Sequence, residues 1–206
     1  MTSDSNAPGT VLTIDGRIAV IQLADPSKKN SLSRPLLESL QKNLNSIHKN
    51  DSIRALIITG SDNVFSSGAD INELRILDTT SALSFARFGQ KLFQGIADSA
   101  LITIAAITGF CMGGGLDLAL ACSYRFATPD SVFVHPGAKL GIITGFAGTQ
   151  RLTSLIGVSN SLHLFLTARR IKADEAESIG LVDNVVSDPV AYARSHIQAL
   201  LQHPDQ

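Results

Sequence analysis

Apolar residues recur at a helical spacing in several stretches of this chain. Between residues 34 and 48, the apolar positions are 36, 37, 40, 44 and 47, which lie on one face of a helix. Pro35 stands near the first position of that helix, and Ser33 is of a type that caps helix N-termini. The pattern predicts further helices at residues 71–77, 81–97, 148–156, 159–167, 173–178 and 191–202.

Short apolar runs, many of them β-branched, alternate with these helices. Residues 11–14 and 18–23 flank Asp15-Gly16, a pair favoured in two-residue turns, so they predict a β-hairpin. Because strands that alternate with helices are typical of α/β proteins, we expect an α/β fold. We expect residues 1–10 to be a disordered lead-in and residues 11–206 to form one domain. The further predicted strands are residues 55–59, 104–107, 124–127, 132–134 and 182–186.

Glycine-bearing loops follow three of these strands, after residues 59, 107 and 134. The middle loop contains three consecutive glycines at 113–115, and good helix formers follow them. The first turn of a helix leaves N–H donors unpaired, and such donors can hold a phosphate, a carboxylate or an oxyanion. A tight turn that only packs a helix on a sheet is the other interpretation. Residues 136–148 are expected to be loop, and ligands in α/β folds bind at such strand ends.

Composition excludes several classes of protein. The net charge of −1 gives no electrostatic reason to expect binding to nucleic acid or to an anionic membrane. No apolar run approaches the roughly 18 residues of a membrane span, and the first residues lack a signal-peptide pattern. Cys111 and Cys122 form no CxxC pair, so we expect free, buried thiols in a reducing compartment, and a cytoplasmic protein. The histidines show no metal-ligand spacing.

Four segments carry a more specific signal because of their order and spacing. They are FSSGADI at 65–71, IAAITGFCMGGGLDLALAC at 104–122, LGIITGFAGTQRL at 140–152 and RIKADEAESIGLVDNVV at 170–186. Together they resemble the crotonase family, that is, enoyl-CoA hydratases and isomerases. The resemblance implies a crotonase-like spiral of β-β-α turns that binds acyl-CoA thioesters. It implies no cofactor beyond the coenzyme A that the substrate carries.

The resemblance also implies an oxyanion hole made by two backbone N–H groups. The two family positions fall here on Ala69 and Gly114. Removing a proton from an acyl thioester, or adding a nucleophile to it, puts negative charge on the carbonyl oxygen. Two preorganised donors would stabilise that charge by about 3–4 kcal/mol each. Gly114 has no Cβ, so the thioester can approach its N–H.

Coenzyme A would meet the first loop of the site. In the family, the backbone from Ala69 through Asp70 and Ile71 to Asn72 contacts the adenine and the thioester. The side chain of Asp70 is expected to cap the helix that begins at Ile71. A basic residue from the preceding loop often meets the phosphates, and residues 28 and 29 are lysines. Lys28 and Lys29 also suit an ordinary solvated loop.

The catalytic acids depart from the family pattern. Hydratases of the family place one glutamate after the glycines and another in a Pro-Glu pair, whereas this chain has Asp117 and Gly137 there. Asp117 is therefore the remaining acid/base candidate, with stabilisation of the helix N-terminus as its alternative role. His135 and Lys139 flank the second position and could supply a proton or hold a carboxylate, although a strand-end histidine is often structural. Gly145 replaces the family's dehalogenase aspartate and is expected in the substrate pocket.

Several functions remain open from the sequence. An acyl-CoA-processing enzyme of hydratase/isomerase type is the leading hypothesis. The alternatives are a decarboxylase of malonyl-type thioesters, a β-diketone or thioester hydrolase, and a family member that binds acyl-CoA or a protein partner without chemistry. Family members usually continue past the last helix predicted here, with helices that build a trimer. The resemblance therefore implies a homotrimer or hexamer, weakened by a truncated C-terminal helical region.

Overall fold

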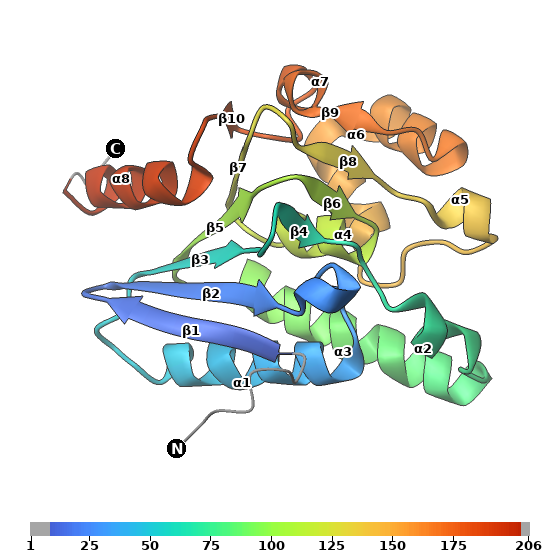
Figure 1. Ribbon diagram of the computed structural model, residues 1–206, viewed down its shortest axis with the longest axis horizontal. Helices are drawn as coiled ribbons and strands as arrows, with labels where there is room; N and C mark the ends of the chain where they lie inside the picture. Colours follow the sequence, from blue (N-terminus) through green and yellow to red (C-terminus); the bar gives the residue numbers. More distant parts are fainter. Residues whose placement is uncertain (1–8, 203–206) are drawn as a thin grey trace.

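The computed structural model describes residues 9–202, and its larger sheet has six strands (Figure 1). Their order across the sheet is β1-β2-β3-β5-β7-β10. β1 and β2 are antiparallel, and every other neighbouring pair is parallel. The strands are β1 (Gly9–Asp15), β2 (Ile18–Ala24), β3 (Ala55–Thr59), β5 (Ile102–Ile107), β7 (Tyr124–Ala127) and β10 (Asn184–Val185).

A second sheet has four short strands in the order β4-β6-β8-β9. They are β4 (Val64–Ser66), β6 (Phe110–Met112), β8 (Val132–Val134) and β9 (Ile171–Lys172). β4, β6 and β8 run parallel, and each follows directly on a strand of the larger sheet, namely β3, β5 and β7. A helix comes after each pair. This succession is the β-β-α spiral that the family resemblance implied, and the α/β class is confirmed.

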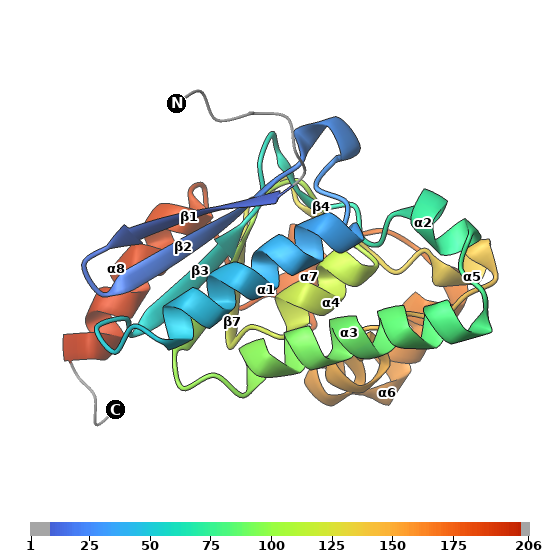
Figure 2. The same ribbon diagram turned by 90° about the horizontal axis from the view of Figure 1, so that it is seen from below.

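Helices cover both faces of the larger sheet. The five apolar positions predicted for α1 (Arg34–His48) are all buried in the main core. Figure 2 shows α1 and α3 (Thr79–Ala97) lying along the same side of the molecule. On the opposite face, Ala193 and Ile197 of α8 (Pro189–Gln202) pack against strand residues such as Ile57.

The remaining helices are short or kinked. They are η1 (Pro26–Lys28), α2 (Ile71–Arg75), α4 (Gly114–Leu120), α5 (Gly137–Leu140), α6 (Gly148–Thr167) and α7 (Ala173–Ser178). α6 contains the two helices predicted on either side of Gly157, whose φ of 79° breaks the helical path. None of the helices within residues 9–202 has the length and apolar character needed to cross a membrane.

Several local predictions were wrong. The hairpin turn is Gly16-Arg17 and not Asp15-Gly16, because Asp15 pairs with Ile18 and Gly16 takes a φ of 57°. Ser33 stands at the N-cap of α1, but its side chain makes no capping hydrogen bond. The supposed loop at 136–148 contains α5. The strand expected at 182–186 is reduced to β10.

The expected lead-in is also partly wrong. Residues 1–8 lie outside the part of the chain that the structure describes. Gly9 and Thr10, the last two residues of that expectation, belong to β1, where they pair with Ala24 and Leu23. Backbone pairing therefore begins earlier than the first apolar residue, since it depends on the neighbouring strand and not on side-chain type.

Candidate active site

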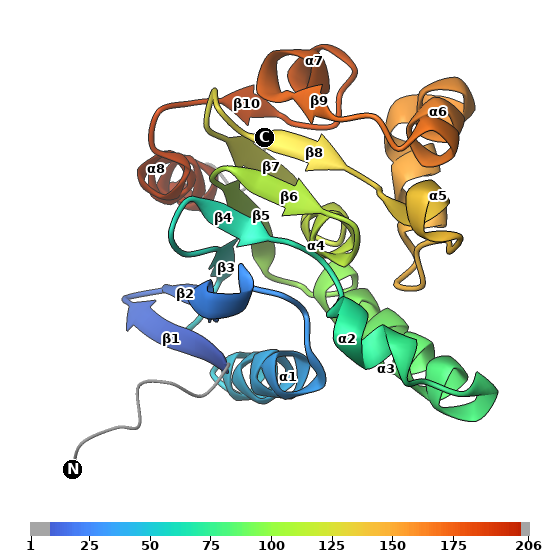
Figure 3. The ribbon, with the colours of Figure 1, turned by 45° about the vertical axis from the view of Figure 1, so that its right-hand side comes forward.

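Three loops leave the smaller sheet at the ends of β4, β6 and β8 (Figure 3). Residues of these loops line a cavity of about 510 Å³. The loops contribute residues 67–69, 113–114 and 135–138, directly after β4, β6 and β8. Because these strands are parallel, their carboxyl ends meet at one edge. The three glycine-bearing loops predicted from the sequence are thus brought together, by strands of the smaller sheet.

The first loop is held tightly against its neighbours. The N–H of Leu32 donates to the Gly68 carbonyl at 2.8 Å, and the N–H of Ser67 donates to the Lys29 carbonyl at 3.0 Å. Gly68 has a φ of 90°, and a Cβ there would lie 2.7 Å from the Met112 carbonyl oxygen and 3.0 Å from the Gly114 nitrogen. Only glycine permits this close approach of the two loops. Ala69 and Gly114 therefore lie at the junction of the first two loops.

The N–H groups of Ala69 and Gly114 are available to a ligand. Gly114 is the first residue of α4, where a helix leaves its N–H groups without an intrahelical acceptor. Gly113 is anchored instead, since its N–H donates to the Val134 carbonyl at 2.9 Å. Among residues 9–202, no hydrogen-bond acceptor serves the N–H of either Ala69 or Gly114, and both residues line the cavity.

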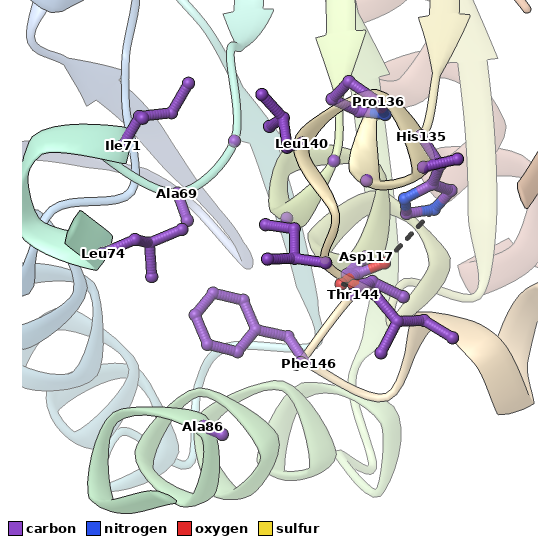
Figure 4. Close-up of a pocket in the computed structure, with 18 of the residues that line it drawn as sticks. Ala69, Ile71, Leu74, Ala86, Asp117, His135, Pro136, Leu140, Thr144 and Phe146 are labelled. Carbon is purple, nitrogen blue, oxygen red and sulfur yellow. Dashed lines mark hydrogen bonds and ion pairs between the residues drawn. The ribbon is translucent and has the colours of Figure 1, made fainter. Parts of the chain in front are cut away.

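Asp117 lies under the cavity floor with no exposed surface. Its Oδ2 accepts a hydrogen bond from the Thr144 hydroxyl, and its Oδ1 is 3.4 Å from His135 Nε2 (Figure 4). Burial raises the pKa of Asp117 to about 7, while the Thr144 hydrogen bond and the charge of Arg151 act in the opposite direction. A carboxyl group with this pKa can both release and take up a proton near neutral pH.

His135 is the second titratable group of the cavity. Its side chain is 3% exposed and its ring lies 4.9 Å from the ring of Phe165, centre to centre. Burial lowers the pKa of His135 to about 4, so the ring is neutral at physiological pH. Although His135 Nε2 and Asp117 Oδ1 are close, they are not aligned as a hydrogen bond. Each atom lacks a hydrogen-bond partner in the described chain.

Some of the other site residues predicted from the sequence line the cavity, and the rest lie outside it. Ile71, Gly137 and Gly145 line the cavity. Gly137 has no room for a side chain in this conformation, because a Cβ would lie 2.5 Å from the Ile142 carbonyl oxygen. The position that carries the second acid in the family is therefore closed by the chain that follows α5.

Asp70, Asn72, Lys29 and Lys139 do not line the cavity. Asp70 caps α2 as predicted, since its Oδ1 accepts from the Asn72 N–H at 2.9 Å. The Oδ2 of Asp70 is 3.1 Å from the Nζ of Lys28. Burial raises the pKa of Asp70, but the ion pair with Lys28 and the capping hydrogen bonds outweigh burial and hold this pKa below its usual range. Lys29 and Lys139 are exposed. The two lysines are therefore free to meet a ligand only outside the cavity.

Thr144, Phe146 and Gly148 were missed as site residues. All three lie in the quoted segment at 140–152, but their contacts join residues far apart in the sequence. Phe146 packs edge-on against Phe93 with ring centres 5.3 Å apart, and it also contacts the site of Gly114. No periodicity or spacing would have indicated that Thr144 donates to Asp117.

The cavity wall is mostly apolar, with side chains from two directions. Leu74 and Ala86 come from the α2–α3 side, and Leu140 comes from α5 (Figure 4). Ile142, just after α5, also lines the cavity. Of the residues that line the described cavity, none is a lysine or an arginine. Residues 9–202 contain no group of three or more His, Cys, Asp or Glu side chains placed to hold a metal ion.

Known proteins resemble this chain over most of its length. The family model described as Enoyl-CoA hydratase/isomerase matches residues 13–206. The short-chain-enoyl-CoA hydratase of Clostridium acetobutylicum is 37% identical over 177 residues, which are 85% of this chain and 68% of that protein. The crotonyl-CoA hydratase of Syntrophomonas wolfei is 38% identical with the same coverage. A crystal structure of enoyl-CoA hydratase from Bacillus anthracis aligns with a TM-score of 0.89 and 32% identity, over 93% of this chain and 76% of that one.

Proposed function

Because this chain belongs to the enoyl-CoA hydratase/isomerase family, within the crotonase superfamily, we propose that it carries out hydration or isomerisation of enoyl-CoA thioesters through an enolate. The observation that supports this most is the pair of unengaged N–H groups, at Ala69 and Gly114, on one cavity. Donors placed where negative charge develops stabilise the transition state more than the ground state. The thioester oxygen would lie between these two groups.

Asp117 supplies the proton chemistry in this proposal. In hydration, the water oxygen bonds to Cβ, the electron pair of the double bond moves toward the thioester oxygen, and the water proton is stored on Asp117. The stored proton then returns to Cα, and the carbonyl group re-forms. In isomerisation the proton leaves Cα and returns to Cγ. Either reaction withdraws one proton and returns one, so a single carboxyl group suffices without an acid at position 137.

Coenzyme A would lie along the first loop. Ser67 joins that loop to the Lys29 carbonyl, and Lys28 joins it to Asp70, so the lysine segment borders the loop that carries Ala69. We place the thioester near Ala69 and the nucleotide toward the backbone of Asp70 to Asn72. Lys29, which is exposed, is the candidate for phosphate contact. This contact attracts a polyanion without affecting the chemical step.

Malonyl-type decarboxylation fits the cavity less well. Its substrate brings a carboxylate, which a site recognises with lysine or arginine. The lining residues in the described chain include neither, and the only titratable side chains among them are Asp117 and His135. An apolar wall with one proton-exchanging acid suits an uncharged enoyl chain. The rival hypothesis is a protein that binds acyl-CoA without catalysis, and the experiment below distinguishes it from the proposed enzyme.

Exposed apolar side chains support a proposal for the assembly, and the cysteines support one for the compartment. Ile76, Val158 and Leu162 lie outside the cavity lining and are 83%, 68% and 52% exposed, which is a high exposure for large apolar side chains. We propose that further copies of the chain cover them, in a trimer or hexamer that sedimentation would reveal. Cys111 and Cys122 are free and buried, which supports a reducing compartment such as the cytoplasm.

Hydration of trans-2-octenoyl-CoA tests the proposal through the loss of absorbance of the conjugated thioester. Asp117→Asn should lower kcat by about 10²–10⁴-fold, the usual effect of removing a general acid or base. Asp62→Asn makes the same change at an exposed carboxyl group and should leave kcat unaltered. Tight calorimetric binding of octanoyl-CoA by a wild-type protein that turns over no enoyl-CoA would establish the inactive binder instead.

A further inference from the structure

Asp117 borders the cavity, but its neighbours leave its side chain no exposed surface. The His135 side chain, by contrast, retains 3%. Thr144 covers Oδ2 through its hydroxyl group, and Oδ1 faces His135 Nε2 at 3.4 Å. Gly148 closes another side, since a Cβ there would collide with Oδ1. A substrate in the cavity therefore meets these neighbours before it meets the carboxyl group.

The two nitrogens of His135 have different surroundings. Nε2 is enclosed and faces Asp117, without a hydrogen-bond partner in the described chain. Nδ1 is neither bonded to a described residue nor enclosed, and it lies on the cavity side of the ring (Figure 4). The imidazole thus connects the cavity to the buried carboxyl group through its two ends. Neutral imidazole has one donor and one acceptor nitrogen, so it can pass a proton across.

We propose that His135 relays the substrate proton between the cavity and Asp117, and so is the group that exchanges the proton directly with the substrate. This inference rests on the proposed function of the site. At the start, Nε2 carries the ring proton and Asp117 is a carboxylate. Nδ1 takes a proton from water or from Cα. A small turn of the ring then aligns Nε2 with Oδ1, from which it lies 3.4 Å away, and the Nε2 proton passes to Asp117. The reverse movement returns a proton from Nδ1 to the substrate carbon and restores both groups.

The electrostatics of the surroundings agree with this direction of transfer. Burial raises the pKa of Asp117 to about 7 and lowers that of His135 to about 4, so the withdrawn proton rests on the carboxyl group. Against burial, the Thr144 hydroxyl, the charge of Arg151 and the backbone N–H of Phe146 each lower the pKa of Asp117. The Cys111 thiol is also close enough to sense the charge of Asp117. Burial raises the pKa of the Cys111 thiol well above its usual range, so it stays neutral. Arg151 favours the carboxylate and keeps it available as the final acceptor.

Thr144 offers a competing path, because its hydroxyl also touches Asp117 and the residue lines the cavity. A hydroxyl could pass a proton in the same manner, but it has no titration near neutral pH. The two paths predict different responses to an added base. Removal of the His135 ring leaves a space beside Oδ1 that small azoles can enter, whereas Thr144→Val leaves none.

Chemical rescue of His135→Ala provides the test, with trans-2-octenoyl-CoA as substrate. We expect kcat to fall at least 100-fold while KM changes less than threefold, and imidazole at tens of millimolar to restore kcat at least tenfold. His135→Phe keeps a ring against Phe165, so it should fold, lose the same kcat and show no rescue. His163→Ala removes an exposed histidine and should neither lose activity nor respond to imidazole.

Each outcome decides between the paths. If His135→Ala and His135→Phe keep kcat within threefold of wild type, or if imidazole restores nothing to a folded His135→Ala, the relay is wrong. A Thr144→Val protein that alone loses kcat would assign the path to the hydroxyl. These failures are distinct from failure of the proposed function, in which Asp117→Asn keeps full turnover.

Discussion

Gly148 lies directly against the carboxyl group of Asp117, and a side chain at position 148 would coincide with Oδ1. The first residue of α6 therefore fixes where the buried acid can stand. Gly148→Ala should displace the carboxyl group from His135 and lower kcat for enoyl-CoA at least tenfold. Gly95→Ala is the matched control, because a Cβ on Gly95 meets nothing within 4 Å and alanine suits a helix interior.

The Gly95→Ala protein should keep wild-type kcat and unfold at an equal or higher urea concentration. Retention of full activity by Gly148→Ala would show that the Asp117 carboxyl group need not stay where the structure places it. Structure determination of the variant would then reveal the new position.

Asp117 should make the protein less stable as the pH rises. The folded pKa of about 7 exceeds the ordinary value of 3.8, so the folded state holds the proton more tightly than the unfolded state. The stabilisation is complete below about pH 4 and is lost between about pH 4 and 7, by about 1.4 kcal/mol per pH unit or about 4 kcal/mol in all. Asp117→Asn stays neutral and should not show this loss.

Urea unfolding of both proteins from pH 4.5 to 8 measures the effect. The free energy of unfolding of wild type should fall relative to that of Asp117→Asn by about 3 kcal/mol over this range. Parallel curves would mean that Asp117 is not a buried neutral acid.

Gly137→Glu should fail to install a second catalytic acid. A Cβ at position 137 meets the Ile142 carbonyl oxygen, whose own residue is held by the hydrogen bond from its N–H to the Gly137 carbonyl at 3.0 Å. We expect the segment after α5 to rearrange, with faster proteolysis there and no rise in kcat for hydration. Ala138→Glu places the same charge on the next residue, which is exposed. A protease should cleave this variant at the wild-type rate. A Gly137→Glu protein with raised kcat would contradict this.

The apolar cavity should favour substrates longer than four carbons. Each further buried methylene contributes about 0.8 kcal/mol, or about fourfold in kcat/KM. We expect trans-2-octenoyl-CoA to exceed crotonyl-CoA by at least tenfold. Ala86→Phe should fill the wall near Gly145 and remove this preference, since a Cβ on Gly145 would already lie 3.7 Å from Ala86.

Ala191→Phe makes the same enlargement on the exposed face of α8 and should leave the chain-length profile as it is. Equal kcat/KM values for the four- and eight-carbon substrates in wild type would contradict a cavity that holds the acyl chain.

Sequence patterns predicted the parts of the fold that have enough residues to show a period. The buried face of α1, the fully buried β3 and the break of α6 at Gly157 are such cases. The strands β4, β6 and β9 were missed because two or three residues carry no period. They exist because neighbouring strands pair with their backbones.

The candidate site divides in the same way. Glycine loops and the helix start at Gly114 pointed to the cavity, and Asp70 was correctly expected to cap α2. The enclosure of Asp117 by Thr144 and Gly148 was not predictable, since these contacts span 27 residues or more. They arise from packing of the segment before α6 onto α4.

A crystal structure of the protein with octanoyl-CoA, which lacks the reactive double bond, tests whether the N–H groups of Ala69 and Gly114 form an oxyanion hole. We expect the thioester oxygen to lie about 3 Å from the backbone nitrogens of both Ala69 and Gly114, with Cα on the His135 side of the cavity. An oxygen that contacts neither nitrogen, or an acyl chain bound outside this cavity, would contradict this expectation.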